Sequence, residues 1–465
     1  MKAAGSRNPP DDYGSFNLPL DRSTHLPMSQ PRSIRVPILT RVEGEGALNI
    51  RLCGSRIEQI ELNIYEPPRF FEALLRGRPI EDVADITSRI CGICPIAYQV
   101  TAVQALETIL GIRIPEPIAA LRRLVYCAEW IESHVLHIHL LHAPDYFDCH
   151  SGIELAKKFP DQVKRGLKLK QLGNRILEVL GGRAIHPINI AIGGFYRLPK
   201  TSQLTDLIPE LQKALQESID AARWLGNLPF PDFTAPYHYV SLIDADRYPI
   251  ESGRVAIGPD QTIGMELYET HFQEFQVPHS TALQSKFLGA DGASSEYFVG
   301  PMARLYHNQE RLGPQAKRLA DELRFDARRC NPFQSILARA IEVVHAFEEA
   351  LRIVQALQDG RLGGLVHRVS YEPHAGIGMS ATEAPRGLIF HRYQIDDVGN
   401  VVFAKIVPPT SQNQARIEAD LRVLLEQIHR DSDPSIALAC ERLVRCYDPC
   451  ISCSTHFLKV KIQRE

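Results

Sequence analysis

The sequence of 465 residues has no apolar run of the roughly 18–20 residues that a membrane-spanning helix needs. Its first 31 residues are polar and rich in Pro and Ser, without the apolar core of a signal peptide. A basic excess is missing too, because 52 Lys and Arg face 55 Asp and Glu, a formal net charge of −3. Nucleic-acid binding generally needs a basic surface. We therefore expect a cytoplasmic protein with a flexible tail over residues 1–31, no membrane span and no nucleic-acid partner.

Nucleotide-binding loops and disulfide scaffolds are absent as well. Neither Gly-x-Gly-x-x-Gly nor a Walker sequence occurs, so a dinucleotide site of that kind is not expected on this chain. Ten cysteines in 465 residues are too few for a fold held together by disulfides. Six of them have no paired spacing and are expected to be small buried residues. The other four form two Cys-x-x-Cys pairs, Cys91 with Cys94 and Cys450 with Cys453.

Hydrophobic periodicity predicts strands near the N-terminus and mostly helices after them. Apolar and polar residues alternate over 33–65, which is typical of strands. We expect residues 229–248 to be irregular and residues 363–410 to mix strand and loop. Helices are expected over residues 70–76, 95–110, 116–142, 161–180, 204–225, 302–323, 333–358 and 414–429. The fold class that follows is α+β, predominantly α-helical, with a small N-terminal β portion.

The two Cys-x-x-Cys pairs offer four thiolates, which suit soft or borderline metals. A structural zinc site is one interpretation, although zinc ribbons separate their pairs by about 15–20 residues and these pairs lie near opposite ends of the chain. A redox dithiol of the thioredoxin type would need only one pair, in a βα unit. A redox or catalytic metal is the third interpretation, and the spacing alone leaves all three open.

The residues around the cysteines narrow this choice. Together they resemble the large subunit of nickel–iron hydrogenases from about residue 41 to residue 456. The motifs are Arg-Val-Glu-Gly at 41–44, Arg-Ile-Cys-Gly-Ile-Cys at 89–94, Gly-Gly-Arg at 181–183 with His-Pro at 186–187, Glu-Ala-Pro-Arg-Gly at 383–387 and Asp-Pro-Cys-x-x-Cys-x-x-His at 448–456. Pro95 after the first pair, Glu45 where many members have His, and Pro-Pro-Thr at 408–410 resemble the cytoplasmic, NAD(P)-linked or sulfhydrogenase branch.

The resemblance implies a nickel–iron centre held by the four cysteines. Cys91 and Cys450 correspond to terminal nickel ligands, and Cys94 and Cys453 to ligands that bridge nickel and iron. Thiolates are soft and are deprotonated when they bind a metal, which suits this role. In this family the iron also carries carbon monoxide and cyanide. No side chain supplies these groups, so a dedicated maturation machinery is implied.

Carboxylates near the cysteines acquire roles by the same resemblance. Glu43 corresponds to the carboxylate that accepts a proton from the thiolate of Cys450, although a strand glutamate taken alone would be expected on a solvated face. Glu72 corresponds to a magnesium ligand, with His456 as the second and a backbone carbonyl near Lys405 as the third. Taken alone, Glu72 would be an ordinary residue of a helix surface. Magnesium usually prefers oxygen ligands, so the histidine is implied by the resemblance only.

Other residues are expected to surround the iron. Arg386 corresponds to a guanidinium that donates to a cyanide nitrogen, with Pro385 fixing its backbone and Asp448 holding its side chain. Pro409 lies where many relatives have Ser or Thr bound to cyanide, and the neighbouring Thr410 is the candidate replacement. Ser133 stands where Asp is common in uptake enzymes. The histidines of the same predicted helix are interpreted as hydrogen-bonded core residues: His134, His137, His139 and His142.

The resemblance thus predicts the catalytic subunit of a hydrogenase, an enzyme that interconverts dihydrogen with protons and electrons. Ligands from both chain ends would meet in one catalytic domain over 32–456, and an extension over 457–465 would be removed by a maturation protease. The implied partners are an iron–sulfur small subunit, flavin or NAD(P) diaphorase subunits, and maturation chaperones. The alternatives are a metal-free subunit related to those of respiratory complex I and a zinc-stabilised helical scaffold.

Overall fold

The computed structural model describes residues 31–289, 292–364 and 366–455. Residues 1–30 of the expected tail, the proposed ligand His456 and the expected extension over 457–465 lie outside this range. Strand β1 begins at Pro31, one residue inside the expected tail. Within the described residues, no helix is long and apolar enough to cross a membrane.

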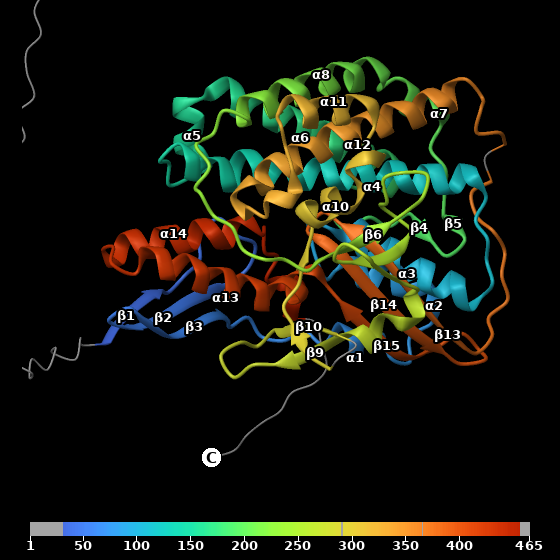
Figure 1. Cartoon of the computed structure of the whole chain (residues 1–465). Coiled ribbons are helices and arrows are strands. Elements are labelled where there is room, and N and C mark those ends of the chain that lie inside the picture. The colour runs from blue at the N-terminus through green and yellow to red at the C-terminus, as the bar shows by residue number, and fades with distance from the viewer. Residues whose placement is uncertain (1–30, 290–291, 365, 456–465) are drawn as a thin grey trace, which may run out of the picture.

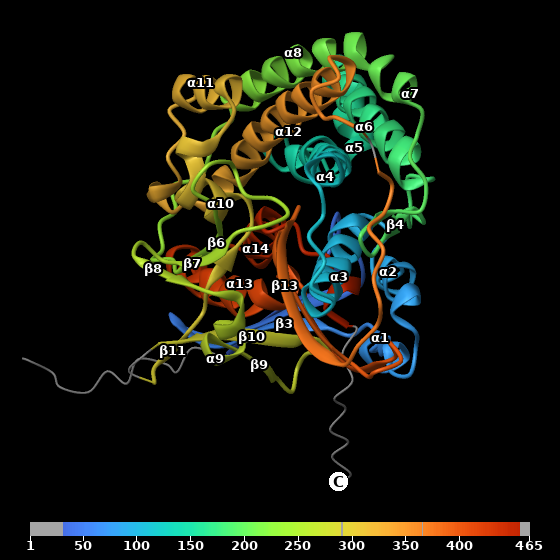
Figure 2. The same ribbon diagram turned by 90° about the vertical axis from the view of Figure 1, so that its right-hand side faces the viewer.

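One half of the molecule is a layered array of helices around α4 (Figures 1 and 2). Nearly all of α4 is buried, and it packs against α6 and α12, while α8 packs against α6 and α12. The helices of this half are α4 (Glu116–Leu136), α5 (Gly152–Lys158), α6 (Pro160–Gly181), α7 (Thr201–Thr205), α8 (Ile208–Leu225), α10 (Pro301–Asn308), α11 (Pro314–Glu322) and α12 (Ser335–Gln358).

The other half combines three-stranded antiparallel sheets with helices (Figure 1). Strands β1 (Pro31–Val36), β2 (Gly46–Cys53) and β3 (Arg56–Ile64) form one sheet, and β13 (Gly376–Ala384), β14 (Gly387–Ile395) and β15 (Val401–Val407) form another. Helix α3 packs on β13 and β14, and α13 packs on β3. The helices here are α1 (Phe71–Leu75), α2 (Ile80–Ser88), α3 (Pro95–Ile109), α9 (Tyr268–His271), α13 (Pro409–Ile428) and α14 (Asp433–Cys446).

Short strands complete the fold between these halves and at its edge. They form the sheets β12–β6–β7–β8 and β11–β10–β9 and the pair β4–β5. Their bounds are β4 (Ile190–Ala191), β5 (Gly194–Phe195), β6 (Tyr239–Ile243), β7 (Arg254–Ile257), β8 (Gln261–Ile263), β9 (Phe272–Gln276), β10 (Leu283–Leu288), β11 (Ser294–Ser295) and β12 (Phe298–Val299). One buried apolar cluster contains residues from Ile34 near one end of the described chain to Cys453 near the other.

The α+β, mainly helical class is confirmed, but several expected elements differ. The helix expected over 302–323 is two helices: α10 ends at Asn308, a 3₁₀ turn follows over Gln309–Arg311, and α11 begins at Pro314, a residue that suits the first helical position. The expected helix 204–225 is likewise α7 followed by α8. The segment expected to be irregular contains β6. Helix α13 begins at Pro409 rather than at residue 414, since proline suits the first position of a helix.

The long helix expected to end at residue 142 is α-helical only to Leu136 and continues as a π-helical turn over His137–His142. Strands β7 to β12 and helices α2, α5, α9 and α14 were not predicted. The strands are short, and the two to six residues of each give too little periodicity to be recognised.

Candidate metal centre

The two Cys-x-x-Cys segments meet in the core. The first lies between α2 and α3, and the second follows α14. The Sγ atoms of Cys91, Cys94, Cys450 and Cys453 all lie within 4.8 Å of one another, and all four residues are buried. Cys91 Sγ is 3.5 Å from Cys450 Sγ, and Cys94 Sγ is 3.8 Å from Cys453 Sγ. The structure therefore brings together residues that are more than 350 positions apart in the sequence.

Helix α3 shapes the first cysteine segment. Cys94 is the residue before the first turn of α3, and Pro95 occupies the first helical position. The backbone N–H groups of Ile93 and Cys94 each donate to Cys91 Sγ at 3.3 Å. Such donors favour the thiolate, which is the form that binds a metal.

A buried carboxylate that the sequence did not reveal closes the first turn of α3. Glu129, on α4, accepts from the backbone N–H of Ile96 at 2.6 Å and of Ala97 at 3.0 Å. These are two of the N–H groups that a helix start leaves without intrahelical partners. Glu129 therefore fixes α3 directly behind Cys94.

The second cysteine segment is held by the N-terminal region of the chain. Glu43 and Cys450 form an isolated parallel β-bridge, and the N–H of Ile451 donates to the carbonyl of Glu43 at 2.9 Å. The N–H of Cys450 donates to Thr410 Oγ1 at 3.0 Å, across the start of α13. Thr410 thus touches the main chain of a predicted ligand, and its neighbour Pro409 forms the first turn of α13.

The Glu43 side chain lies directly on this segment. Cys450 Sγ donates to Glu43 Oε2 at 3.0 Å, and the N–H of Ser452 donates to the same oxygen at 3.1 Å. The Ser452 hydroxyl donates to Glu43 Oε1 at 2.5 Å. Sequence reasoning missed Ser452, although its place inside the Cys-x-x-Cys spacing was a signal that its backbone would lie close to the sulfurs.

The electrostatics of the four sulfurs are unfavourable without a cation. Hydrogen bonds from Cys450 and Cys453 hold the pKa of Cys91 well below its usual value. Burial raises the pKa of Cys450 well above its usual value. Four thiolates this close repel one another in a buried site. Bound metal cations would offset that repulsion, so the donor set fits a soft or borderline metal centre.

Arg386 brings a positive charge to the same place. Its Nε donates to the Asp448 carbonyl at 2.8 Å, and its Nη2 lies 3.3 Å from Asp448 Oδ1. Burial opposes the charged guanidinium, but Asp448 and the nearby cysteines outweigh it and hold the pKa of Arg386 well above its usual value. Among the described residues, the buried Nη1 of Arg386 has no hydrogen-bond partner, which leaves its two N–H groups for a bound group. Asp448 itself has φ 52°, a left-handed conformation that turns the chain after α14.

The expected magnesium ligands are placed only in part. Glu72 Oε1 accepts from the N–H of Ile406 at 2.8 Å, so this carboxylate lies on β15 beside the backbone of Lys405. The Lys405 side chain pairs with Glu269 at 3.0 Å, which is compatible with the expectation that a backbone carbonyl near Lys405, and not this side chain, would bind magnesium. His456 lies outside the described residues, so the three ligands are not seen together.

The histidines of α4 and the following π-helical turn are buried, as expected of core residues. His134 Nε2 lies 3.0 Å from Glu342 Oε2, and His137 Nε2 lies 2.9 Å from the Arg445 carbonyl. Burial lowers the pKa of His134 to about 4, so this ring is neutral at pH 7. Ser133 is buried beside them, and its hydroxyl has no hydrogen-bond partner within residues 31–289, 292–364 and 366–455.

Comparison with known proteins places this site in a family. The model of the nickel-dependent hydrogenase family matches residues 69–165 and 292–456. Two curated relatives from Pyrococcus furiosus are the alpha subunits of sulfhydrogenase 1 and sulfhydrogenase 2. The first is 33% identical over 92% of this chain and 98% of its own length, and the second is 35% identical over 92% and 100%.

Solved structures give the same answer. An NAD⁺-reducing [NiFe]-hydrogenase in the H₂-reduced state superposes with a TM-score of 0.82 and 25% identity, over 91% of this chain and 99% of that chain. A [NiFeSe]-hydrogenase from Dm. baculatum, 21% identical, shares the fold with a TM-score of 0.74 over 92% of this chain and all of that chain. The expected resemblance is thereby confirmed: this chain belongs to the nickel-dependent hydrogenase family, as a large subunit of a hydrogenase, an oxidoreductase.

Proposed function

We propose that this chain is the catalytic subunit of a nickel–iron hydrogenase that cleaves dihydrogen reversibly and heterolytically. The observation that carries the proposal is the cluster of four buried Sγ atoms within 4.8 Å of one another. Cys91 and Cys450 would hold nickel as terminal ligands, and Cys94 and Cys453 would bridge nickel and iron. When bound, the metals supply the electron-rich centre at which dihydrogen is split.

Arg386 would bind the diatomic ligands of the iron. Its buried Nη1 has no partner in the part of the chain that the structure describes, and its N–H groups could donate to a cyanide nitrogen. Asp448 holds the other side of the guanidinium through its carbonyl and its carboxylate. Pro385, Pro409 and Thr410 would line this side of the site, and the Thr410 hydroxyl fixes the backbone of Cys450.

Glu43 is the proposed proton carrier. Its Oε2 lies 3.0 Å from Cys450 Sγ, within the range for direct proton transfer. The N–H and hydroxyl of Ser452 orient the carboxylate, so it faces the sulfur in one geometry. Glu72, His456 and a carbonyl near Lys405 would bind magnesium.

Electrons would leave the site beside the first cysteine segment, which reaches the surface at one residue. Gly92 is exposed, and a Cβ built on it would lie 3.9 Å from Ile185 Cγ2. Ile185 and Ile188 are large apolar side chains that are 60% and 47% exposed. This surface supports docking of an iron–sulfur small subunit next to Cys91. The sulfhydrogenase and NAD⁺-reducing relatives support further diaphorase subunits in a cytoplasmic complex.

Metal analysis of the native complex tests the proposal. We expect nickel and iron together, co-purification of an iron–sulfur protein, and dihydrogen-dependent dye reduction. Zinc alone would instead support the helical scaffold, and the absence of metal would support a subunit of the complex I type. Either result would overturn the proposed function.

A further inference from the structure

Arg386 sits at the tip of a tight β-hairpin. Strand β13 ends at Ala384 and β14 begins at Gly387, and these two residues are paired in the ladder. Pro385 and Arg386 therefore form a two-residue connection, which in most hairpins is exposed to solvent. Here the turn is buried and Arg386 is 3% exposed. Something in the interior must therefore satisfy the backbone groups of this turn.

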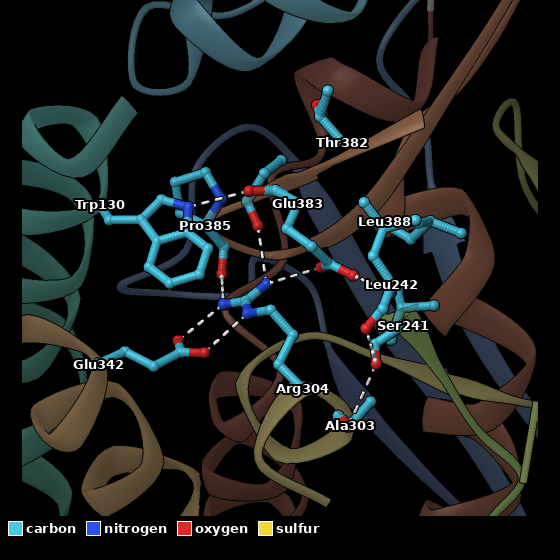
Figure 3. A network of polar contacts seen from close by, with 12 residues as sticks. Trp130, Ser241, Leu242, Ala303, Arg304, Glu342, Thr382, Glu383, Pro385 and Leu388 are labelled. Carbon is cyan, nitrogen blue, oxygen red and sulfur yellow. Dashed lines mark hydrogen bonds and ion pairs between the residues drawn. The ribbon is translucent and has the colours of Figure 1, made fainter. Parts of the chain in front are cut away.

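One buried side chain binds the two carbonyls that precede Arg386. Arg304, on α10, donates from Nη1 to the Ala384 carbonyl at 2.9 Å and from Nη2 to the Pro385 carbonyl at 3.0 Å (Figure 3). The indole N–H of Trp130 donates to the preceding carbonyl, that of Glu383, at 2.9 Å. Three consecutive carbonyls are thus fixed by donors from two helices, α10 and α4.

Arg304 is itself fixed from every direction. Its Nε and Nη2 each lie 2.7 Å from an oxygen of Glu342, and its Nη1 lies 3.1 Å from Glu383 Oε2. With the two carbonyls, these contacts use all five N–H donors of the guanidinium. Its carbon lies 4.3 Å from the ring centre of Trp130, a cation–π contact.

The opposite side of the turn leaves no room for movement. A Cβ built on Gly300 would lie 2.9 Å from the Arg386 carbonyl, and one built on Gly387 would lie 2.8 Å from the Gly300 nitrogen. Both glycines have positive φ, 125° and 137°. Because Arg304 and Gly300 belong to the same short segment, that segment clamps the hairpin tip on two sides.

We propose that Arg304 is a positioning residue for Arg386: by binding the Ala384 and Pro385 carbonyls, it sets where the Arg386 guanidinium lies over the metal centre. This inference rests on the proposed function. The polar partners of the Arg304 side chain among the described residues are Glu342, Glu383 and the Ala384 and Pro385 carbonyls, so it acts on Arg386 through the hairpin backbone. A displacement of about 1 Å at a catalytic site can lower turnover about 100-fold, so such a clamp matters for the reaction as well as for folding.

The test uses Arg304→Lys in the purified native complex. Lysine keeps the positive charge beside Glu342 and Glu383 but lacks the planar fork, so the two carbonyls lose their donors. We expect faster amide exchange in the peptide over 383–387, a shift of the infrared bands of the iron-bound diatomic ligands, and turnover about 10- to 100-fold lower.

A matched control separates positioning from general destabilisation. Arg122 is also fully buried, with two bonds to Glu107 and one to the Ala191 carbonyl. Glu107 lies in the last turn of α3, at the opposite end from Cys94. Arg122→Lys should lower the melting temperature and leave the infrared bands unchanged. Equal band shifts in both variants would overturn the proposal.

A double-mutant cycle tests directly whether Arg304 acts through Arg386. If Arg304 acts through Arg386, adding Arg304→Lys to an Arg386→Lys enzyme should lower turnover by less than about 2-fold. A full additional loss, or an Arg304→Lys enzyme with unchanged bands and turnover, would refute the positioning role. Should Arg304→Lys fail to fold, Trp130→Phe replaces it in the same cycle, because it removes the donor to the Glu383 carbonyl and keeps an aromatic ring beside Arg304. A wild-type complex without nickel, iron or such bands would refute the proposed function and not the clamp, which the amide exchange still tests.

Discussion

The two cysteine segments each contact a carboxylate, but the two carboxylates have different roles. Each is held by a buried or half-buried carboxylate from a distant part of the chain. Glu129 binds backbone N–H groups behind Cys94. Glu43 also binds a backbone N–H, that of Ser452, but its second contact is the sulfur of Cys450.

Glu129 can therefore only help to hold a metal ligand in place, whereas Glu43 can also exchange a proton with one. A carboxylate that bonds only to amides contributes to where the loop lies. A carboxylate 3.0 Å from a thiol is also placed to accept its proton. Four predictions test this contrast, beginning with the sulfurs that both carboxylates serve.

The largest effect is expected from removing a bridging sulfur. Cys94→Ser and Cys453→Ser should each abolish bound nickel, iron and turnover together, because each thiolate would hold both metals. Metal analysis and dihydrogen oxidation measure this. Cys127 is a matched control, since it is fully buried on α4 and burial raises its pKa to about 12, so it stays a thiol. Cys127→Ser should keep both metals; a Cys453→Ser enzyme that also kept them would contradict the ligand assignment.

The second effect concerns the carboxylate at the sulfur. Glu43→Gln keeps the size of the side chain but cannot carry a proton. Metals should still bind, while hydrogen–deuterium exchange with solvent and net turnover fall by about 10²–10⁴-fold or more. Interconversion of ortho- and para-hydrogen inside the site should persist. Normal solvent exchange in the metal-loaded variant would exclude Glu43 as the proton carrier.

The third effect concerns the carboxylate at the helix start. Glu129→Gln keeps one acceptor oxygen, so one of two buried N–H groups loses its partner, at a cost of about 1–3 kcal/mol in unfolding free energy. Denaturant unfolding measures this loss. Per metal-loaded molecule, solvent exchange should stay within a few-fold of wild type. A loss of exchange as large as that of Glu43→Gln would remove the contrast between the two carboxylates.

The smallest effect is expected at Thr410. Thr410→Val removes the acceptor for the N–H of Cys450 and should lower the unfolding free energy by about 1 kcal/mol. Thr410→Ser keeps the hydroxyl and is the matched control. If the free energy of unfolding falls equally in both variants, packing rather than this hydrogen bond explains the role of Thr410.

The sequence indicated much of this centre because its chemistry lies in local motifs. The motifs around the cysteines carried the family resemblance, which implied that Cys91, Cys94, Cys450 and Cys453 share one site, and in the structure they do lie together. The long helices were predicted because their apolar periodicity extends over many turns, as in α6 and α12.

The supporting residues could not be predicted in the same way. Glu129 and Arg304 lie on helices whose pattern shows only that they are buried, and their partners are backbone atoms that carry no sequence signal. Gly313-Pro314 marks the start of α11, but the sequence has no Gly or Pro where α10 ends at Asn308. The contact of Glu43 with Cys450 was implied by the family resemblance, and nothing in the spacing required it.

The bridge between Glu43 and Cys450 also has a consequence for the order of folding. It joins residues 407 positions apart, a contact that cannot form before nearly all of the described chain has been synthesised. Closing so long a loop has an entropic cost that local helix contacts do not bear. The helical half can therefore assemble early, while the two ligand pairs come together only when the final turns dock. Until then Cys91 and Cys94 lack Cys450 and Cys453 beside them, so the complete set of four sulfurs exists only once the end of the described chain is in place.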